Sequence, residues 1–218
     1  MNYFAHALPF LDRPWFAAAT GIPDWLTVCD RQVRLRSKHA KPFLDDAEAT
    51  VAAVAGGVVQ HLQDDQWFHG TEAFVSTWLE LTAAARDALD GERGFRPSFL
   101  GHLLTEVLLD AALIAERPEA MHRYYALLDD VVPEQIEVAV NRMAPRSTSN
   151  LASLIHGFRQ ARILSDYAED GRLMVRLNQI MKRVKCLPLP KTFADLLPDA
   201  RRLVNERQEA LLKLPKEE

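Results

Sequence analysis

The 218-residue chain contains few of the residues and segments that mark specialised protein classes. It has two cysteines, Cys29 and Cys186, which stand far apart and outside any paired motif, so the sequence predicts free thiols in a reducing compartment, by default the cytoplasm. The first eleven residues lack the basic start and the apolar run of a signal peptide. No later stretch reaches the roughly 18 uncharged apolar residues of a membrane span, so we expect a soluble protein.

The chain also lacks a strong excess of charge of one sign. Its composition, with 48% hydrophobic and 26% charged residues, is that of an ordinary globular protein, and its formal net charge of −4 argues against general nucleic-acid binding. An anionic partner must therefore meet a local basic patch. The stretch RQVRLRSKHAK at residues 31–41 offers Arg34, Arg36 and Lys38 as candidate ligands of a substrate phosphate, with a solvated face as the alternative interpretation.

Strand signals are missing too, because no segment shows the alternation and turn spacing of a sheet. Helical periodicity recurs along the chain, and it predicts an all-α, bundle-like domain of seven to nine helices over residues 1–218. We expect residues 150–218 to form a C-terminal helical part packed on the core that carries the candidate site.

Four segments carry this prediction. Residues 45–70 predict one long helix, whose Gly56 and Gly57 indicate close approach of another helix. Residues 71–89 predict an amphipathic helix, and residues 99–114 predict a helix that is apolar nearly all round and therefore buried. Two shorter helices should follow, then a helical stretch interrupted near Gly171 and a charged amphipathic tail from Lys191 onward.

Polar residues repeat every four positions on two of these helices. One stripe is His61, Asp65 and His69, and the other is His102, Glu106 and Asp110. Residues four apart lie on one helix face and about 6 Å apart along the axis, so neighbouring members can chelate one ion while the outer pair, about 12 Å apart, cannot easily do so.

A carboxylate on a largely buried helix needs compensation, because burying it unpaired costs several kcal/mol or more. A metal ion, an arginine or exposure along a cleft could provide that compensation, and the second stripe favours metal. Two divalent ions about 3.5–4 Å apart, bridged by Asp65 or Glu106, would use both stripes. Mixed imidazole and carboxylate ligands suit zinc, manganese or iron better than calcium.

Three short motifs, MNYFAH, GVVQHLQDD and FLGHLLTEVLLD, resemble the acyl carrier protein phosphodiesterase family. The resemblance implies a metal-dependent phosphodiesterase, with matching positions at His6, His61, Asp65, Glu106 and Asp110, and more loosely at Asp24. The chain departs from the family by having Leu62 directly after the helix histidine and no histidine after Asp110. The pairs His61/Asp65 and His102/Glu106 also resemble those of zinc-dependent phospholipase C and related nucleases, which are all-helical.

The resulting hypothesis is a cytoplasmic hydrolase in which one or two divalent ions, manganese or zinc, act on a phosphoester. The resemblance implies a phosphopantetheinyl carrier protein as one possible partner. Asp65 or Asp110 would orient the attacking water. The predicted metal ligands are His6, Asp24, His61, Asp65, His69, His102, Glu106 and Asp110. His61 and Asp65 are the best supported of these, whereas His69, one turn further on, alternatively lines the mouth of a cleft.

Two alternatives stay open. In the first, a catalytically inactive helical scaffold or binding protein keeps the fold, and arginines such as Arg96 or Arg123 pair with the carboxylates. In the second, the helices hold a di-iron site of the oxidase type. His122 and His156 are interpreted as surface or hydrogen-bonded residues.

Overall fold

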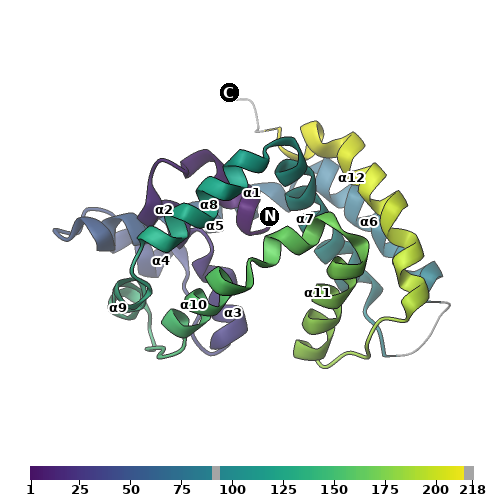
Figure 1. Cartoon of the computed structure of the whole chain (residues 1–218). Helices are drawn as coiled ribbons and strands as arrows, with labels where there is room; N and C mark the ends of the chain where they lie inside the picture. The colour runs from purple at the N-terminus through teal and green to yellow at the C-terminus, as the bar shows by residue number, and fades with distance from the viewer. Residues whose placement is uncertain (90–93, 214–218) are drawn as a thin grey trace. The chain divides into compact units, whose positions relative to one another are not determined.

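The computed structural model describes residues 1–89 and 94–213, which contain helices and no strand (Figure 1). The all-α class is therefore confirmed. The predicted number of seven to nine helices is wrong, since the described residues form twelve α-helices and four short 3-10 helices. The excess comes mainly from helices of four to eight residues before residue 44, which are too short to show a helical period in the sequence.

The chain divides into two compact units, each made of two segments. Unit 1 comprises Met1–Gln66 and Arg117–Arg162, and unit 2 comprises Trp67–Glu116 and Ile163–Glu218. The prediction of one domain over 1–218 is not tested by this division, and each unit is described by itself.

Unit 1 contains helices α1 to α5, helices α8 to α10 and two 3-10 helices. Their bounds are α1 Tyr3–Ala7, η1 Leu8–Phe10, α2 Pro14–Ala19, α3 Ile22–Cys29, α4 Ser37–Ala40, η2 Lys41–Phe43, α5 Ala49–Phe68, α8 Pro118–Asp130, α9 Pro133–Met143 and α10 Leu151–Ala161. Proline stands in the first turn of α2, α3, α8 and α9, where its fixed φ and missing N–H suit a helix start.

Unit 2 contains the last two residues of α5 together with α6, α7, α11, α12 and two 3-10 helices. Their bounds are α6 Glu72–Ala88, α7 Pro97–Glu116, η3 Ile163–Ala168, α11 Asp170–Arg183, η4 Lys191–Leu196 and α12 Leu197–Leu211. The expected interruption begins at Arg162, which has left-handed backbone angles, and Gly171 lies inside the first turn of α11.

Helix α2 crosses α5 at the glycine pair, as the sequence predicts. A Cβ atom added to Gly57 would lie 2.3 Å from the carbonyl oxygen of Phe16 and 2.6 Å from Cβ of Ala19. Only glycine allows this approach, because those distances are shorter than real Cβ contacts. His61 lies four residues after Gly57, so the crossing brings the next turn of α5 beside the C-terminal end of α2.

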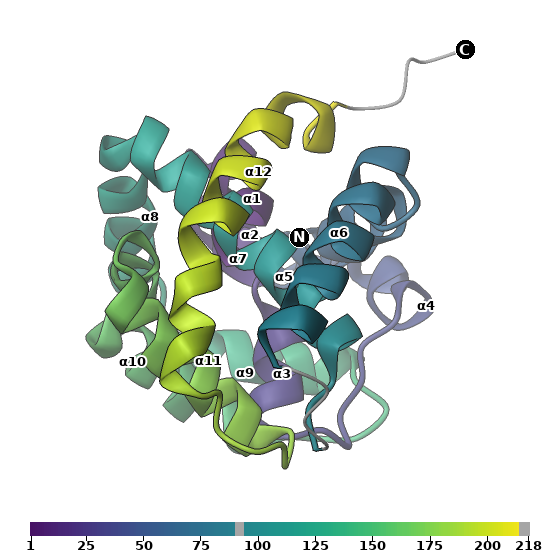
Figure 2. The ribbon, with the colours of Figure 1, turned by 90° about the vertical axis from the view of Figure 1, so that its right-hand side faces the viewer.

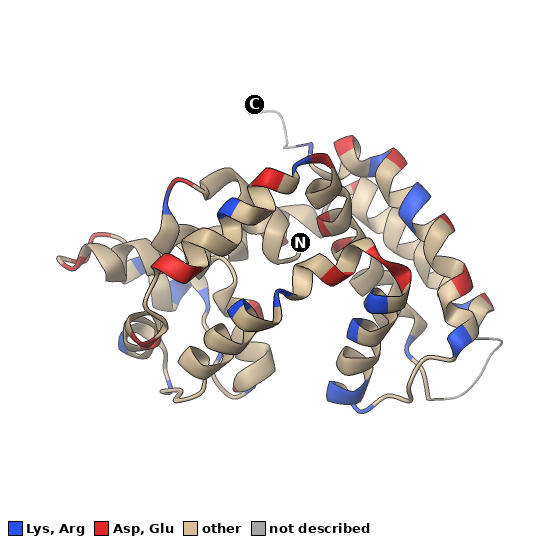
Figure 3. Cartoon of the chain, in the orientation of Figure 1, with Lys and Arg blue, Asp and Glu red and all other residues tan. Residues whose placement is uncertain are grey.

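Helices α6 and α7 cross in unit 2 by the same means. A Cβ atom on Gly101 would lie 2.4 Å from the Thr82 hydroxyl oxygen and 2.6 Å from the Thr82 backbone nitrogen. His102 follows directly on α7. Helix α12 packs on both α6 and α7 (Figures 1 and 2) and carries charged residues of both signs along its length (Figure 3).

Helix α7 is the unit 2 core helix that the sequence predicts. Twelve of its residues are buried, including Leu104, Leu108 and Asp110. By length and composition it is the one described helix that could cross a membrane, but 67% of its apolar window is buried inside the protein. That degree of burial is typical of a core helix.

Candidate functional site

His61 on α5 is buried, and one of its ring nitrogens has a defined hydrogen-bond partner. Its Nδ1 lies 2.7 Å from the backbone oxygen of Thr20, the C-cap residue of α2. A carbonyl oxygen can only accept, so Nδ1 carries the proton and donates it. In the neutral ring, Nε2 then carries the lone pair, and this atom faces Asp65 Oδ2 at 3.3 Å.

His6 on α1 has a similar arrangement. Its Nδ1 lies 3.1 Å from Asp64 Oδ2, and the other Asp64 oxygen accepts a hydrogen bond from Gln60 at 2.7 Å. The His6 side chain is completely buried, and its ring stacks on that of His61 with centroids 4.1 Å apart. Its Nε2 lies 3.2 Å from Asp65 Oδ1 but has no hydrogen-bond partner among the described residues. This buried nitrogen points at a carboxylate without the geometry of a hydrogen bond.

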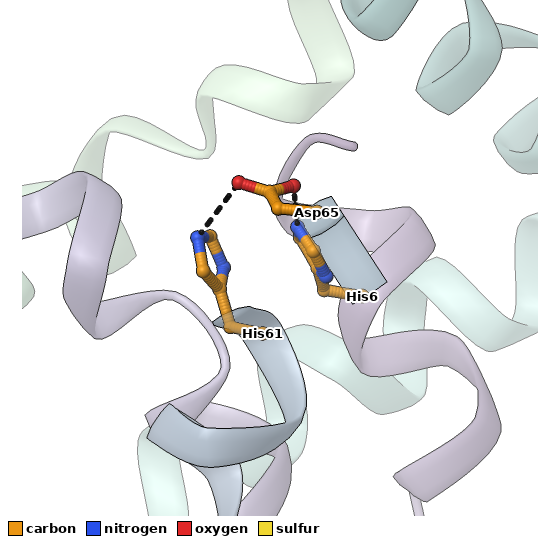
Figure 4. A group of neighbouring side chains, drawn as sticks. All are labelled: His6, His61 and Asp65. Carbon is orange, nitrogen blue, oxygen red and sulfur yellow. Dashed lines mark ion pairs between the residues drawn. The ribbon is translucent and has the colours of Figure 1, made fainter. Parts of the chain in front are cut away.

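Asp65 joins these groups, as Figure 4 shows. Its two oxygens face the two imidazoles, and Oδ1 also accepts a hydrogen bond from the amino group of Met1 at 2.8 Å. Burial acts to raise the pKa of Asp65, but the contacts with His6 and His61 and the positive amino group outweigh it and hold the pKa well below its usual range. Asp65 is therefore a carboxylate at neutral pH.

His6 responds to the same contacts. Burial acts to lower its pKa, whereas the hydrogen bond with Asp64 and the nearby negative charge of Asp65 raise it, and the pKa reaches about 9. His6, His61 and Asp65 each offer a ligand atom within 4.8 Å of the others. We call these three residues the unit 1 triad.

A second group of the same composition lies in unit 2. His69 Nε2, in the turn after α5, lies 2.9 Å from Glu106 Oε1, and His102 Nε2 lies 3.2 Å from the same oxygen. Their three ligand atoms also lie within 4.8 Å of one another. Burial acts to raise the pKa of Glu106, and the hydrogen bonds with His102 and His69 are among the opposing influences that bring the pKa below its ordinary value. We call His69, His102 and Glu106 the unit 2 triad.

Aromatic rings surround the unit 2 triad. The ring centroids of His69 and His102 are 4.8 Å apart, and the ring of Phe74 lies within 5.1 Å of both. The ring of Trp78 lies 6.2 Å from that of His102, and its indole nitrogen donates to the backbone oxygen of Ser98. The two histidine side chains are 32% and 37% exposed, so the triad is open to solvent.

The remaining predicted site residues belong to neither triad. Asp24 lies in the first turn of α3 and is half-buried, and Asp110 is fully buried on α7. Arg34, Arg36 and Lys38 are exposed in and before α4. His69, which the sequence alone supports less than His61, pairs with Glu106.

The two arginines named for the scaffold interpretation do not pair with a carboxylate in the described part of the chain. Arg96 and Arg123 are exposed and form no ion pair with a described residue, and Asp65 has histidines and an amino group as its partners there. Three contributors escaped sequence reasoning, namely Asp64, the backbone oxygen of Thr20 and the amino group of Met1. Asp64 stands beside Asp65 and four residues after Gln60, and that spacing could have indicated it. No sequence signal marks a backbone carbonyl.

Comparison with known proteins gives no relative. No protein-family model matches the chain, and no curated protein or solved structure is significantly similar to it.

Proposed function

We propose that the unit 1 triad holds a divalent ion, manganese or zinc, and that the protein hydrolyses a phosphodiester. The observation that carries this proposal is the buried Nε2 of His6, which lacks a hydrogen-bond partner among the described residues and lies with His61 Nε2 against the carboxylate of Asp65. Two imidazoles and one carboxylate are the protein ligands of one class of catalytic zinc site.

The distances within the triad suit a shared ion. Two ligand atoms of one tetrahedral zinc lie about 3.3 Å apart when each is about 2.0–2.1 Å from the ion. The nitrogen–oxygen distances here are 3.2 and 3.3 Å. They join His6 Nε2 to Oδ1 and His61 Nε2 to Oδ2 of Asp65, and one ligand atom from each residue lies within 4.8 Å of the others, which is close enough for the three to share an ion.

The groups around the triad orient its ligands. Asp64 accepts from His6 Nδ1, and the Thr20 carbonyl accepts from His61 Nδ1, so both rings direct Nε2 toward Asp65. Metal-binding histidines in general donate their second ring N–H to a carboxylate or carbonyl in this way. This feature favours a metal site over an ordinary buried ion pair.

The substrate class rests on the sequence motifs that resemble acyl carrier protein phosphodiesterases. An ion at the triad supplies a water nucleophile at neutral pH and positive charge for the phosphoryl oxygens. Asp65, with 28% of its side chain exposed, is the triad member that solvent reaches most readily. Its carboxylate can orient the attacking water by accepting a hydrogen bond from it. Arg34, Arg36 and Lys38 are exposed and can bind a phosphate or an acidic carrier protein.

The test combines metal analysis with hydrolysis of bis(p-nitrophenyl) phosphate in the presence of Mn²⁺ or Zn²⁺. We expect Asp65→Asn and His61→Ala to lose one bound ion per chain and at least 100-fold in rate, a loss typical for removal of a group that stabilises the transition state. His122→Ala, which removes an exposed histidine outside both triads, is the matched control.

The outcomes distinguish the metal site from the hydrolytic activity. An ion lost from Asp65→Asn together with the activity supports the proposal. A wild-type protein that binds an ion at the triad but hydrolyses neither this substrate nor a phosphopantetheinylated carrier protein would support the catalytically inactive scaffold. A wild-type protein whose ion content equals that of Asp65→Asn overturns the metal site itself.

A further inference from the structure

The unit 2 triad is built from rigid and separately positioned parts. His102 and Glu106 lie one turn apart on α7, whose position is fixed where Gly101 contacts Thr82 of α6. His69 comes from the turn between α5 and α6, where the Thr71 hydroxyl accepts from the Phe74 backbone and caps α6. The three side chains therefore converge because of the helix packing and do not depend on a long loop.

Both histidines of this triad face the same carboxylate oxygen. The Nε2 atoms of His69 and His102 lie 2.9 and 3.2 Å from Glu106 Oε1. Neither His69 nor His102 uses Nδ1 in a hydrogen bond with a described residue. No described protein group thus opposes the tautomer that places the proton on Nδ1 and the lone pair on Nε2, which is the form that binds a metal.

We propose that His69, His102 and Glu106 form a second metal site, which binds one zinc-class ion within unit 2 independently of the unit 1 triad. The donor set of two imidazoles and one carboxylate is that of three-ligand zinc sites. The nitrogen–oxygen distances of 2.9 and 3.2 Å need to lengthen only slightly to reach the roughly 3.3 Å that separates two ligand atoms of a tetrahedral zinc ion. The ion would join the turn at His69 to α7.

Exposure decides how this site behaves. With the histidine side chains 32% and 37% exposed, an ion bound here remains in contact with solvent and exchanges readily. Phe74 lies against both imidazoles and restricts the rings without supplying ligands. Because two of its three ligands are imidazoles, the site suits zinc or cobalt, which accept imidazole, and not magnesium or calcium, which require oxygen ligands.

Trp78 provides a readout that does not depend on activity. Its ring lies 6.2 Å from that of His102, so a paramagnetic Co²⁺ ion at the triad should quench its fluorescence. The experiment uses the full chain without a histidine tag, treated with EDTA, dialysed and titrated with Co²⁺ and, separately, with Zn²⁺. Trp78→Phe identifies the part of the fluorescence change that Trp78 contributes.

The variants separate this site from the unit 1 triad. We expect two Zn²⁺ ions per wild-type chain, one in Asp65→Asn and one in His102→Ala. Quenching of Trp78 should persist in Asp65→Asn and disappear in His102→Ala and Glu106→Gln, whereas His122→Ala should match the wild type. His102 and His69 are partly exposed, and thermal unfolding will verify that their variants fold.

Two results would overturn the second site. One is a His102→Ala protein that binds as many ions as the wild type with the same Trp78 quenching. The other is an Asp65→Asn protein that binds no ion at all, which would mean that the unit 2 triad cannot hold an ion without the first site. Neither result depends on hydrolysis, so failure of the proposed reaction is a separate outcome.

Discussion

The two triads have the same composition, two histidines and one carboxylate, but different surroundings. In unit 1, His6 and His61 are buried, and each ring donates Nδ1–H to a protein oxygen. In unit 2, His69 and His102 are partly exposed and are held by ring contacts and one shared carboxylate oxygen. Identical ligand types therefore give one preoriented group and one adjustable group.

This difference predicts different metal chemistry. Preorientation removes part of the entropy lost when ligands are ordered, so we expect tighter binding and slower exchange at the unit 1 triad. The unit 1 triad must also lose a proton from His6 when it binds an ion, since the pKa of His6 is raised to about 9. Solvent access should make ion exchange faster at the unit 2 triad than at the unit 1 triad.

The largest predicted effect concerns the charge on His6 in EDTA-treated protein. Because the pKa of His6 is raised from 6.5 to about 9 in the folded state, the proton stabilises the fold fully below pH 6.5, and this stabilisation is lost as the pH rises through 9. The shift corresponds to on the order of 3 kcal/mol. Urea unfolding of the wild type and of His6→Gln should show the difference in unfolding free energy shrinking by about that amount between pH 6 and pH 10. An unchanged difference would mean that His6 is neutral throughout.

The next effect comes from the glycine crossings. Gly57→Ala and Gly101→Ala should each lower the unfolding free energy by about 1–3 kcal/mol, because the added methyl group meets backbone atoms that cannot rotate away. Gly157→Ala on α10 is the matched control. Its Cβ meets nothing within 4 Å, so alanine should stabilise that helix by up to about 1 kcal/mol.

The Gly57→Ala and Gly101→Ala variants also test whether the two triads bind ions independently. Gly57→Ala should weaken ion binding at the unit 1 triad by moving Thr20 relative to His61, and Gly101→Ala should weaken binding at the unit 2 triad. Zn²⁺ titration counts the ions bound at both triads, and Co²⁺ quenching of Trp78 fluorescence reports the unit 2 triad separately. If each variant weakens ion binding at both triads equally, the two triads do not bind ions independently.

A smaller effect is expected at Asp64, which orients His6. Asp64→Asn keeps an oxygen near His6 Nδ1 but removes the charge, and loss of such an outer partner typically costs 10- to 100-fold in metal affinity. Isothermal titration with Zn²⁺ measures the affinity, and Asp45→Asn, at an exposed aspartate, is the control. Equal affinities of Asp64→Asn and wild type would show that the orientation of His6 is unimportant.

The smallest effect is at the cap of α6. Thr71→Ala removes the oxygen that accepts from Phe74 N, and a lost N-cap typically costs about 1 kcal/mol. We expect thermal unfolding to shift down and Zn²⁺ binding at the unit 2 triad to weaken, because His69 lies two residues before the cap. Thr71→Ser retains the acceptor and should restore both. A serine variant as weak as the alanine variant would show that the hydroxyl is not the cause.

Much of the fold follows from local patterns. The long helix from Ala49 to Phe68 and the buried helix from Pro97 to Glu116 were predictable because their apolar residues repeat over several turns. The short helices α1 to α4 were not, because four to eight residues give too few turns for a period to appear. Their positions depend on prolines and on packing.

The sequence by itself determined the all-helical class, the four-residue spacing of the pairs His61/Asp65 and His102/Glu106, and the close helix approach at Gly56 and Gly57. Those features depend on residues within a few turns of one another, which helix geometry relates directly. Only the tertiary structure decided that His6 joins His61 and that His69 joins His102. It also supplied Asp64 and the Thr20 carbonyl as hydrogen-bond acceptors. Contacts between residues 33 to 58 positions apart depend on how the helices pack, and every residue type carries a backbone carbonyl, so the sequence does not mark the one that is used.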